Sequence, residues 1–341
     1  MIWSAVTVLI LLVAVRLVTR LRARLDHEAV FERLPVRPRP KEQRAHGTLR
    51  GVRLPGPGGA VLDAWLLLPN TPRPPIVVMA PGMGLAKDVH LEPLAWRFVA
   101  SGVAALIVDF RTLGGSDGVP RHWVDPARHA ADFEAALDHV RGELAGEIDP
   151  ERVALWGTGL SAAVALVVAA RRAEVRAVVA QAPQLDPPSP EGLARTRFLL
   201  WGGLDLLGMV APVYVPLYGR PGEWAVASSA QHPGVRDGEG GAPFWAAAAP
   251  GPRGGTTGCW PAGSQRWPTS RRSRARRAAR RCWSPPATTT SCRSARSRRP
   301  PKRSTRPSRV FDGGHYDLSV GPRSAANAAA QAAFLARHLT R

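Results

Sequence analysis

The chain has 341 residues, enough for one large α/β domain or two small ones. Its formal charge of +20 would suit a nucleic-acid-binding protein, but residues 246–309 alone hold 16 Arg and one Lys. Without these 17 cations, 29 Lys and Arg face 26 Asp and Glu, a net charge of +3, so the rest of the chain does not have the composition of a nucleic-acid binder.

Residues 1–34 begin with a mostly apolar run, Ile2–Val15, followed by Arg16, Arg20, Arg22 and Arg24. A membrane-spanning helix needs about 20 apolar residues, so the length of this run is marginal. We expect a hydrophobic to amphipathic helix that acts as a short membrane anchor, with the basic flank and the rest of the chain on the cytoplasmic side. The alternatives are a surface helix on a cytoplasmic protein and a start codon assigned too early.

Residues 47–182 show the pattern of an alternating α/β core. Thr48–Leu54 and Ala60–Leu68 flank a Pro-Gly-Pro-Gly-Gly turn, which predicts a hairpin. Short apolar runs typical of buried parallel strands follow, with helical segments between them. These runs are Ile76–Ala80, Val103–Asp109, Val153–Trp156 and Val175–Ala180, and the helices are His90–Ala100 and Asp125–Leu144. The alternation predicts a doubly wound, mostly parallel sheet.

The rest of the chain divides into three parts. Residues 183–245 hold apolar helical stretches and Pro-rich turns, as expected for a helical cap over the sheet. Residues 246–309 contain no Leu, Ile, Val, Met, Asp or Glu, so we expect them to be disordered and not to pack as a strand of the sheet. Residues 310–341 comprise a short strand Val310–Asp312, a loop with His315, and a closing helix Ser324–Leu339.

Ligands of open α/β sheets bind at the carboxyl ends of the strands, and four such ends carry characteristic loops here. They are Pro81–Gly84 (PGMG), Asp109–Gly118 (DFRTLGGSDG), Gly157–Ser161 (GTGLS) and Gly313–Asp317 (GGHYD). In these motifs and their order the chain resembles the α/β-hydrolase family, in its branch of serine esterases, peptidases and lysophospholipase-like enzymes. The resemblance covers residues 47–240 and 310–341.

The resemblance implies an acyl-transfer site without a metal or other cofactor. His315 corresponds to the general base, and the backbone N–H groups of Met83 and Leu160 correspond to the oxyanion donors. Gly157 and Gly159 belong to the elbow, where the family pattern G-x-S-x-G places the nucleophilic serine. The substrate expected from the resemblance is a small or lipid-like acyl compound.

This chain departs from the family pattern at the nucleophile. The elbow alignment places Gly159, which has no hydroxyl group, where the serine belongs. Ser161 lies two residues later and would be the catalytic nucleophile only if the elbow turned later; otherwise it is a serine of the first helical turn.

The chain also departs at the triad acid, which the family usually places after the next-to-last strand, here near residues 280–292. The segment 246–309 contains no carboxylate, and Asp186 is the nearest substitute, although an ordinary loop role suits it as well. A basic insertion, a plain linker and translation in a shifted reading frame all fit this composition. Starting each codon one base earlier turns the Trp283 slot into Leu and permits an acid loop soon after it. We therefore favour the frame shift.

The sequence thus predicts a serine hydrolase of esters, thioesters or amides that is impaired or inactive as written, a pseudoenzyme. The alternative is a non-catalytic protein that binds a membrane or nucleic acid through residues 246–309. No specific nucleic-acid partner is expected under the first interpretation.

Overall fold

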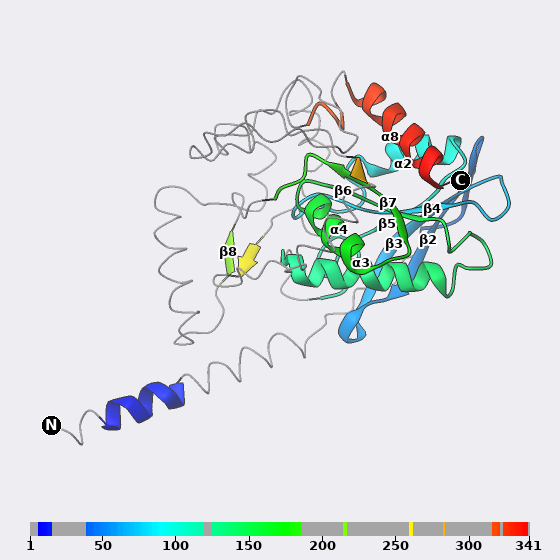
Figure 1. The fold of residues 1–341 in the computed structure, drawn as a ribbon. Coiled ribbons are helices and arrows are strands. Elements are labelled where there is room, and N and C mark those ends of the chain that lie inside the picture. Colours follow the sequence, from blue (N-terminus) through cyan, green and yellow to red (C-terminus); the bar gives the residue numbers. More distant parts are fainter. Residues whose placement is uncertain are drawn as a thin grey trace.

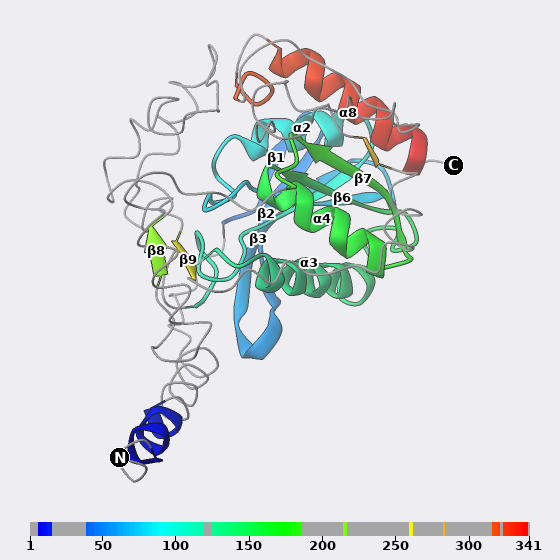
Figure 2. The same ribbon diagram turned by 60° about the vertical axis from the view of Figure 1, so that its left-hand side comes forward.

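The computed structural model describes residues 6–15, 39–118, 124–185, 316–320 and 323–339, together with the backbone of 214–216, 259–261 and 282–283. The expected strand Val310–Asp312, His315, Asp186, and most of the cap and of segment 246–309 lie outside these residues. Figures 1 and 2 show a twisted sheet with helices on both faces.

Among the described residues the sheet has eight strands, in the order β1-β2-β3-β5-β4-β6-β7-β10. The pairs β1-β2, β2-β3 and β3-β5 are antiparallel, and the pairs β5-β4, β4-β6, β6-β7 and β7-β10 are parallel. The strands are β1 (Glu42–Arg44), β2 (Gly47–Pro55), β3 (Val61–Pro69), β4 (Ile76–Ala80), β5 (Ala104–Val108), β6 (Val153–Thr158), β7 (Val175–Gln181) and β10 (Cys282–Trp283). The prediction of a doubly wound, mostly parallel sheet is confirmed.

The predicted hairpin is the antiparallel pair β2 and β3, closed by the short 3-10 helix η1 (Pro57–Gly59). The central strands β4 and β5 are buried at every position, which explains their unbroken apolar sequences. A separate pair, β8 (Tyr214–Pro216) with β9 (Cys259–Pro261), is antiparallel.

In the part of the chain that the structure describes, four helices cover the two faces of the sheet. Helices α3 (Pro126–Arg141) and α4 (Leu160–Arg171) pack on one face, and α2 (Leu91–Ala100) and α8 (Ser324–Leu339) on the other (Figure 2). The predicted cap of α3 is present, because the carboxylate of Asp125 accepts hydrogen bonds from the backbone N–H groups of Ala127 and Arg128. The chain crosses from one side of β4 to the other between β5 and β6, so the carboxyl ends of β4 and β6 form the switch point of the sheet.

At the N-terminus the structure describes a helix over residues 6–15 whose side chains are exposed. Of the helices in the described ranges, none is both long and apolar enough to cross a membrane. The expected spanning anchor therefore finds no support in the described residues.

Strand β10 corrects one expectation. Residues 246–309 were not expected to add a strand to the sheet, yet Cys282 and Trp283 pair in parallel with Val178 and Val179 of β7. Backbone hydrogen bonds do not require aliphatic side chains, so composition alone did not reveal this pairing.

Candidate active site

The elbow lies between β6 and α4, at the switch point of the sheet. Gly159 joins the two elements with φ 57° and ψ −118°, a backbone conformation that residues other than glycine adopt only with strain. Its N–H donates to the carbonyl of Gln181 at 3.0 Å, and its own carbonyl accepts from the N–H of Gln184 at 2.9 Å. A Cβ atom added at Gly159 would meet nothing within 4 Å. The sharp turn is therefore present, and the space for a side chain at its tip is open.

Gly157 allows the close contact between β6 and α4. A Cβ atom at this position would lie 2.5 Å from the backbone N of Ala162 and from the carbonyl carbon and oxygen of Ser161. The helix therefore approaches the strand as closely as it does because residue 157 has no side chain.

The hydroxyl group of Ser161 is fully engaged in local hydrogen bonds. The side chain is buried in the first turn of α4, and its Oγ accepts from the N–H of Thr158 at 2.9 Å. The same Oγ lies 2.9 Å from the carbonyl oxygen of Ala80 and 3.0 Å from that of Thr158, either of which can accept its proton. Ser161 thus links the ends of β4 and β6.

The expected oxyanion donors lie on either side of the elbow. Met83 follows β4 in a tight loop, where Gly84 has φ 71° and the N–H of Leu85 donates to the carbonyl of Gly82 at 3.2 Å. Leu160 is the first residue of α4, and the first N–H groups of a helix have no acceptor inside it. The N-terminus of α4 also favours negative charge.

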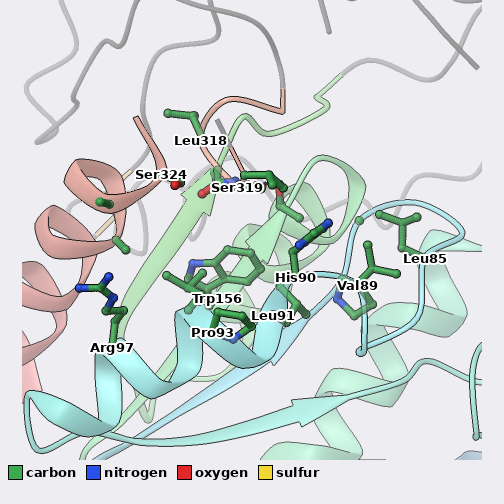
Figure 3. A pocket seen from close by; sticks show the side chains of 18 residues that line it. Leu85, Val89, His90, Leu91, Pro93, Arg97, Trp156, Leu318, Ser319 and Ser324 are labelled. Carbon is green, nitrogen blue, oxygen red and sulfur yellow. Dashed lines mark hydrogen bonds between the residues drawn. The ribbon is translucent and has the colours of Figure 1, made fainter. Parts of the chain in front are cut away.

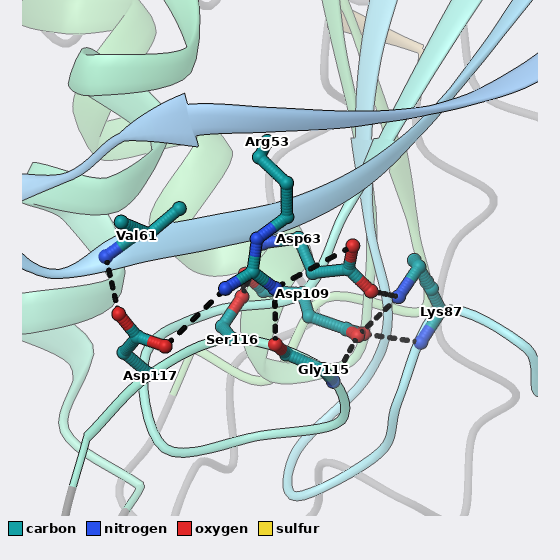
Figure 4. A network of polar contacts seen from close by, with 8 residues as sticks. All are labelled: Arg53, Val61, Asp63, Lys87, Asp109, Gly115, Ser116 and Asp117. Atoms are coloured by element: carbon teal, nitrogen blue, oxygen red, sulfur yellow. Dashed lines mark hydrogen bonds and ion pairs between the residues drawn. The ribbon is translucent and has the colours of Figure 1, made fainter. Parts of the chain in front are cut away.

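A buried ionic cluster, formed by Lys87, Asp63 and Asp109, anchors the loop that carries Met83 (Figure 4). The Nζ atom of Lys87 lies 2.5 Å from Oδ2 of Asp63 and 2.6 Å from Oδ2 of Asp109. Its backbone N–H also donates to Oδ1 of Asp109 at 2.6 Å, while the N–H of Gly115 donates to Oδ2 at 2.9 Å. One carboxylate therefore ties the loop after β4 to the loop after β5.

The charges of this cluster are coupled. Burial alone would lower the pKa of Lys87, but the carboxylates of Asp109 and Asp63 outweigh it, so this pKa is raised and the ammonium group is retained. Burial raises the pKa of Asp109, and the charge of Lys87 opposes this shift. Gly114 and Gly115 make the arrangement possible, since a Cβ atom at either position would collide with a carboxylate of the cluster.

A second buried pair holds the start of the loop after β5. The Nε of Arg111 donates to Oδ1 of Asp132 at 2.5 Å, and the backbone N–H of Arg111 donates to Oδ2 at 2.9 Å. Burial raises the pKa of Asp132 to about 6, and the charge of Arg111 limits the rise.

A network of buried amides connects α8 to the sheet. The Oε1 atom of Gln331 accepts from Nε1 of Trp156 at 2.7 Å, and the Oε1 atom of Gln181 accepts from Nε2 of Gln331 and from Nδ2 of Asn327, both at 2.8 Å. Asn327 also donates to the carbonyl of Leu318 at 3.0 Å, and Gln181 donates to Oγ of Ser319 at 3.2 Å. The network therefore fixes the loop 316–320, which directly follows His315 in the sequence.

A cavity of about 290 Å³ opens beside the elbow. Figure 3 shows it between α2, the beginning of α8 and the loop 316–320, with the indole of Trp156 in its floor. Thr158 and Gly82 line the end of the cavity nearest to the elbow.

Among the residues expected at the site, the structure brings together Gly157, Gly159, Leu160, Ser161 and the loop of Met83 at the ends of β4 and β6. His315 and Asp186 lie outside the described residues. Within the described ranges no three His, Cys, Asp or Glu side chains are placed to hold a metal ion.

Sequence reasoning did not find the ionic cluster or the amide network. The sequence offered one sign of them, namely polar residues next to apolar ones. Lys87 follows Leu85-Ala86, and Asn327 and Gln331 stand in an alanine-rich helix. Their partners on the sheet lie between 22 and 175 positions away, and spacing along the chain does not reveal such pairs.

Comparison with known proteins gives consistent matches. A family model described as serine aminopeptidase, S33, matches residues 71–224. A thiohydrolase of Arthrinium phaeospermum is 37% identical over 123 residues, which are 36% of this chain and 39% of that protein. The quorum-quenching protein AidA of Acinetobacter baumannii is 34% identical over 175 residues, 49% of this chain and 57% of the relative.

Solved structures share the fold. The crystal structure of the α/β hydrolase GrgF from Penicillium matches with a TM-score of 0.61 at 21% identity, covering 86% of this chain and 99% of that one. The structure of DcsB in complex with its substrate analogue matches with a TM-score of 0.59 at 19% identity, covering 85% and 99%. In sequence, the chain spans between 39% and 57% of the length of the two relatives named above.

Proposed function

Because the chain belongs to the α/β-hydrolase family, we propose that its ancestral activity is the hydrolysis of a small-molecule ester or thioester, or of an amide, through a serine nucleophile without a cofactor. We further propose that the chain as written performs this reaction weakly or not at all. A relative named thiohydrolase favours a thioester among these substrates.

The observation that carries the proposal is the conformation of Gly159. The strained turn with φ 57° persists although the residue at its tip has no hydroxyl group, and a side chain there would meet no atom within 4 Å. The hydroxyl of Ser161 is buried and bonded to Thr158 and Ala80. A nucleophile needs a free hydroxyl that a base can deprotonate, so these contacts favour a structural role for Ser161.

The remaining groups fit the chemistry of acyl transfer. His315 would act as the general base, and the N–H groups of Met83 and Leu160 would stabilise the developing oxyanion, each by about 3 kcal/mol of barrier. The acid that orients the base has no counterpart in residues 246–309, and loss of that acid alone can cost about 10⁴ in turnover.

We also propose that residues 246–309 are translated in a shifted frame and replace the native strand and acid loop. Their lack of aliphatic and acidic residues supports this proposal. The pairing of Cys282 and Trp283 with β7 adds support, because the next strand of the fold belongs at this edge of the sheet.

A comparison of four full-length proteins tests the function: the parent, the frame-restored chain, Gly159→Ser, and the combination of both changes. Each is assayed on a short-chain aryl ester and on the matching thioester. We expect turnover to be confined to the combination, because a base without a hydroxyl to deprotonate does little. Strong turnover by the frame-restored chain without Gly159→Ser would show that Ser161 is the nucleophile.

A further inference from the structure

The walls of the cavity beside the elbow are mostly apolar. Leu85, Val89 and Leu91 contribute from the loop after β4 and the start of α2, and Ala328 contributes from α8. The indole of Trp156 is held in place by its hydrogen bond to Gln331. Side chains fixed by packing and by buried hydrogen bonds form a cavity of defined shape, and such a cavity favours an apolar ligand.

Polar and charged groups line the cavity at several points, among them His90 and Arg97 on the side of α2. Thr158, the residue before Gly159, and Gly82, the residue before Met83, line it beside the elbow. Gln181 and Ser319 line the cavity as well, and they already bond to each other at 3.2 Å. If the reacting carbonyl lies beside Gly159, as the proposed function requires, the rest of the ligand would extend between α2 and α8.

The volume sets the size of the tail. At roughly 30 Å³ for an atom group the size of a water molecule, a cavity of about 290 Å³ holds roughly ten such groups. This volume lies near the lower end of small-molecule sites, which run from about 300 to 1,000 Å³. An unbranched acyl group of about eight carbons with its carbonyl head fits this space, whereas a long fatty chain exceeds it.

We propose that this cavity receives the acyl chain of the substrate, an unbranched aliphatic group of about eight carbons, and that the chain as written binds the corresponding carboxylic acid without turning any ester over. The proposal rests on the proposed function for the position of the reacting carbonyl at the elbow. It adds the class of acyl group, and it assigns a binding role to a protein whose nucleophile position is empty.

Calorimetric titration of the full chain with butanoate, octanoate and dodecanoate tests the proposal. Each methylene buried in an apolar site strengthens binding about fourfold. We therefore expect octanoate to bind about two orders of magnitude more tightly than butanoate, and dodecanoate to gain little beyond octanoate. Equal affinity for butanoate and octanoate, or no binding of octanoate, would overturn the proposal.

Two substitutions on α8 locate the bound acid. Ala325 is exposed and lines the cavity, so Ala325→Trp should fill the opening and weaken octanoate binding at least tenfold with little effect on the fold. Ala329 is exposed on the same helix outside the lining, and Ala329→Trp serves as the matched control with unchanged affinity. Equal effects of the two substitutions would place the acid elsewhere and overturn the proposal.

The two proposals fail separately. Octanoate binding that depends on Ala325, together with an inactive combination of the frame-restored chain and Gly159→Ser, would retain the acyl cavity and reject the hydrolase. The opposite outcome is turnover by that combination while Ala325→Trp changes neither octanoate binding nor the preference for acyl length. It would support the proposed hydrolase activity and overturn the proposal that this cavity binds the acyl chain.

Discussion

Replacing Lys87 by Met removes the cation that bridges Asp63 and Asp109. Its Nζ atom is 2.5 Å from one carboxylate and 2.6 Å from the other, and all three side chains are largely buried. Methionine has a similar volume and carries no charge, so the two carboxylates would face each other with only Arg53, whose Nη1 lies 3.7 Å from Oδ1 of Asp63, left nearby. Breaking a buried ion pair from one side costs about 3–5 kcal/mol. We expect the free energy of unfolding to fall by that amount.

The loss should depend on pH. Burial raises the pKa of Asp109 and the charge of Lys87 opposes this shift, so without Lys87 the pKa of Asp109 in the folded state rises further above the unfolded value. The folded protein then binds more protons than the unfolded chain in the window between these two values. Stability is then retained below the unfolded pKa and lost as the pH rises through the folded pKa. The deficit against the parent should be smaller at pH 5 than at pH 8.

Urea unfolding followed by circular dichroism measures the effect, and thermal unfolding should show a midpoint lowered by roughly 6–20 °C. Lys41→Met is the matched control, because Lys41 is exposed, and a surface substitution changes stability by about 0.5 kcal/mol or less. Equal stability of the two variants would refute the argument that the buried cluster anchors the loop after β4.

Three further outcomes follow from local geometry. Gly157→Ala should lower the free energy of unfolding by about 1–3 kcal/mol through overpacking, measured as a lower urea midpoint, and should speed amide exchange in α4. The matched variant Gly159→Ala adds a Cβ atom that meets no other atom. It should cost only the strain of its backbone conformation and leave amide exchange in α4 unchanged. Gln331→Leu should cost about 1–3 kcal/mol in urea unfolding and move the indole N–H resonance of Trp156, because that donor loses its acceptor. The raised pKa of Asp132, about 6, means that its contribution to stability is present below the unfolded pKa of 3.8 and is lost as the pH rises through about 6. Asp132→Asn should flatten the pH dependence of the unfolding free energy in this window, and an unchanged slope would contradict the assignment.

The order of helices and strands could be predicted because local sequence patterns agree with the elements that the structure shows. Continuous apolar runs became β4 and β5, and the Asp125-Pro126 pair became the cap and first residue of α3. The elbow could be located because the family pattern G-x-S-x-G, which marks a strand-to-helix turn, aligns with Gly157-Thr158-Gly159 at the end of an apolar strand. Gly159 occupies that turn with a positive φ, which glycine adopts readily.

Contacts between distant segments were not readable. Lys87 finds its partners on β3 and at the end of β5, and Gln181 meets Gln331 only because α8 packs beside β7. Such pairs depend on how the strands are ordered, which no local pattern encodes. The pairing of β10 was missed for a different reason, since side-chain composition does not report on backbone hydrogen bonding.

Covalent labelling with a fluorophosphonate probe tests most directly the claim that the elbow lacks a nucleophile. The label on the full chain is measured by intact mass and located by peptide mapping. The parent and Ser161→Ala should both remain unlabelled, because the only serine at the elbow has its hydroxyl bonded to Ala80 and Thr158. In the frame-restored chain, Gly159→Ser should take up one equivalent of probe at the introduced hydroxyl. A parent protein that is labelled, with the label lost in Ser161→Ala, would contradict the account.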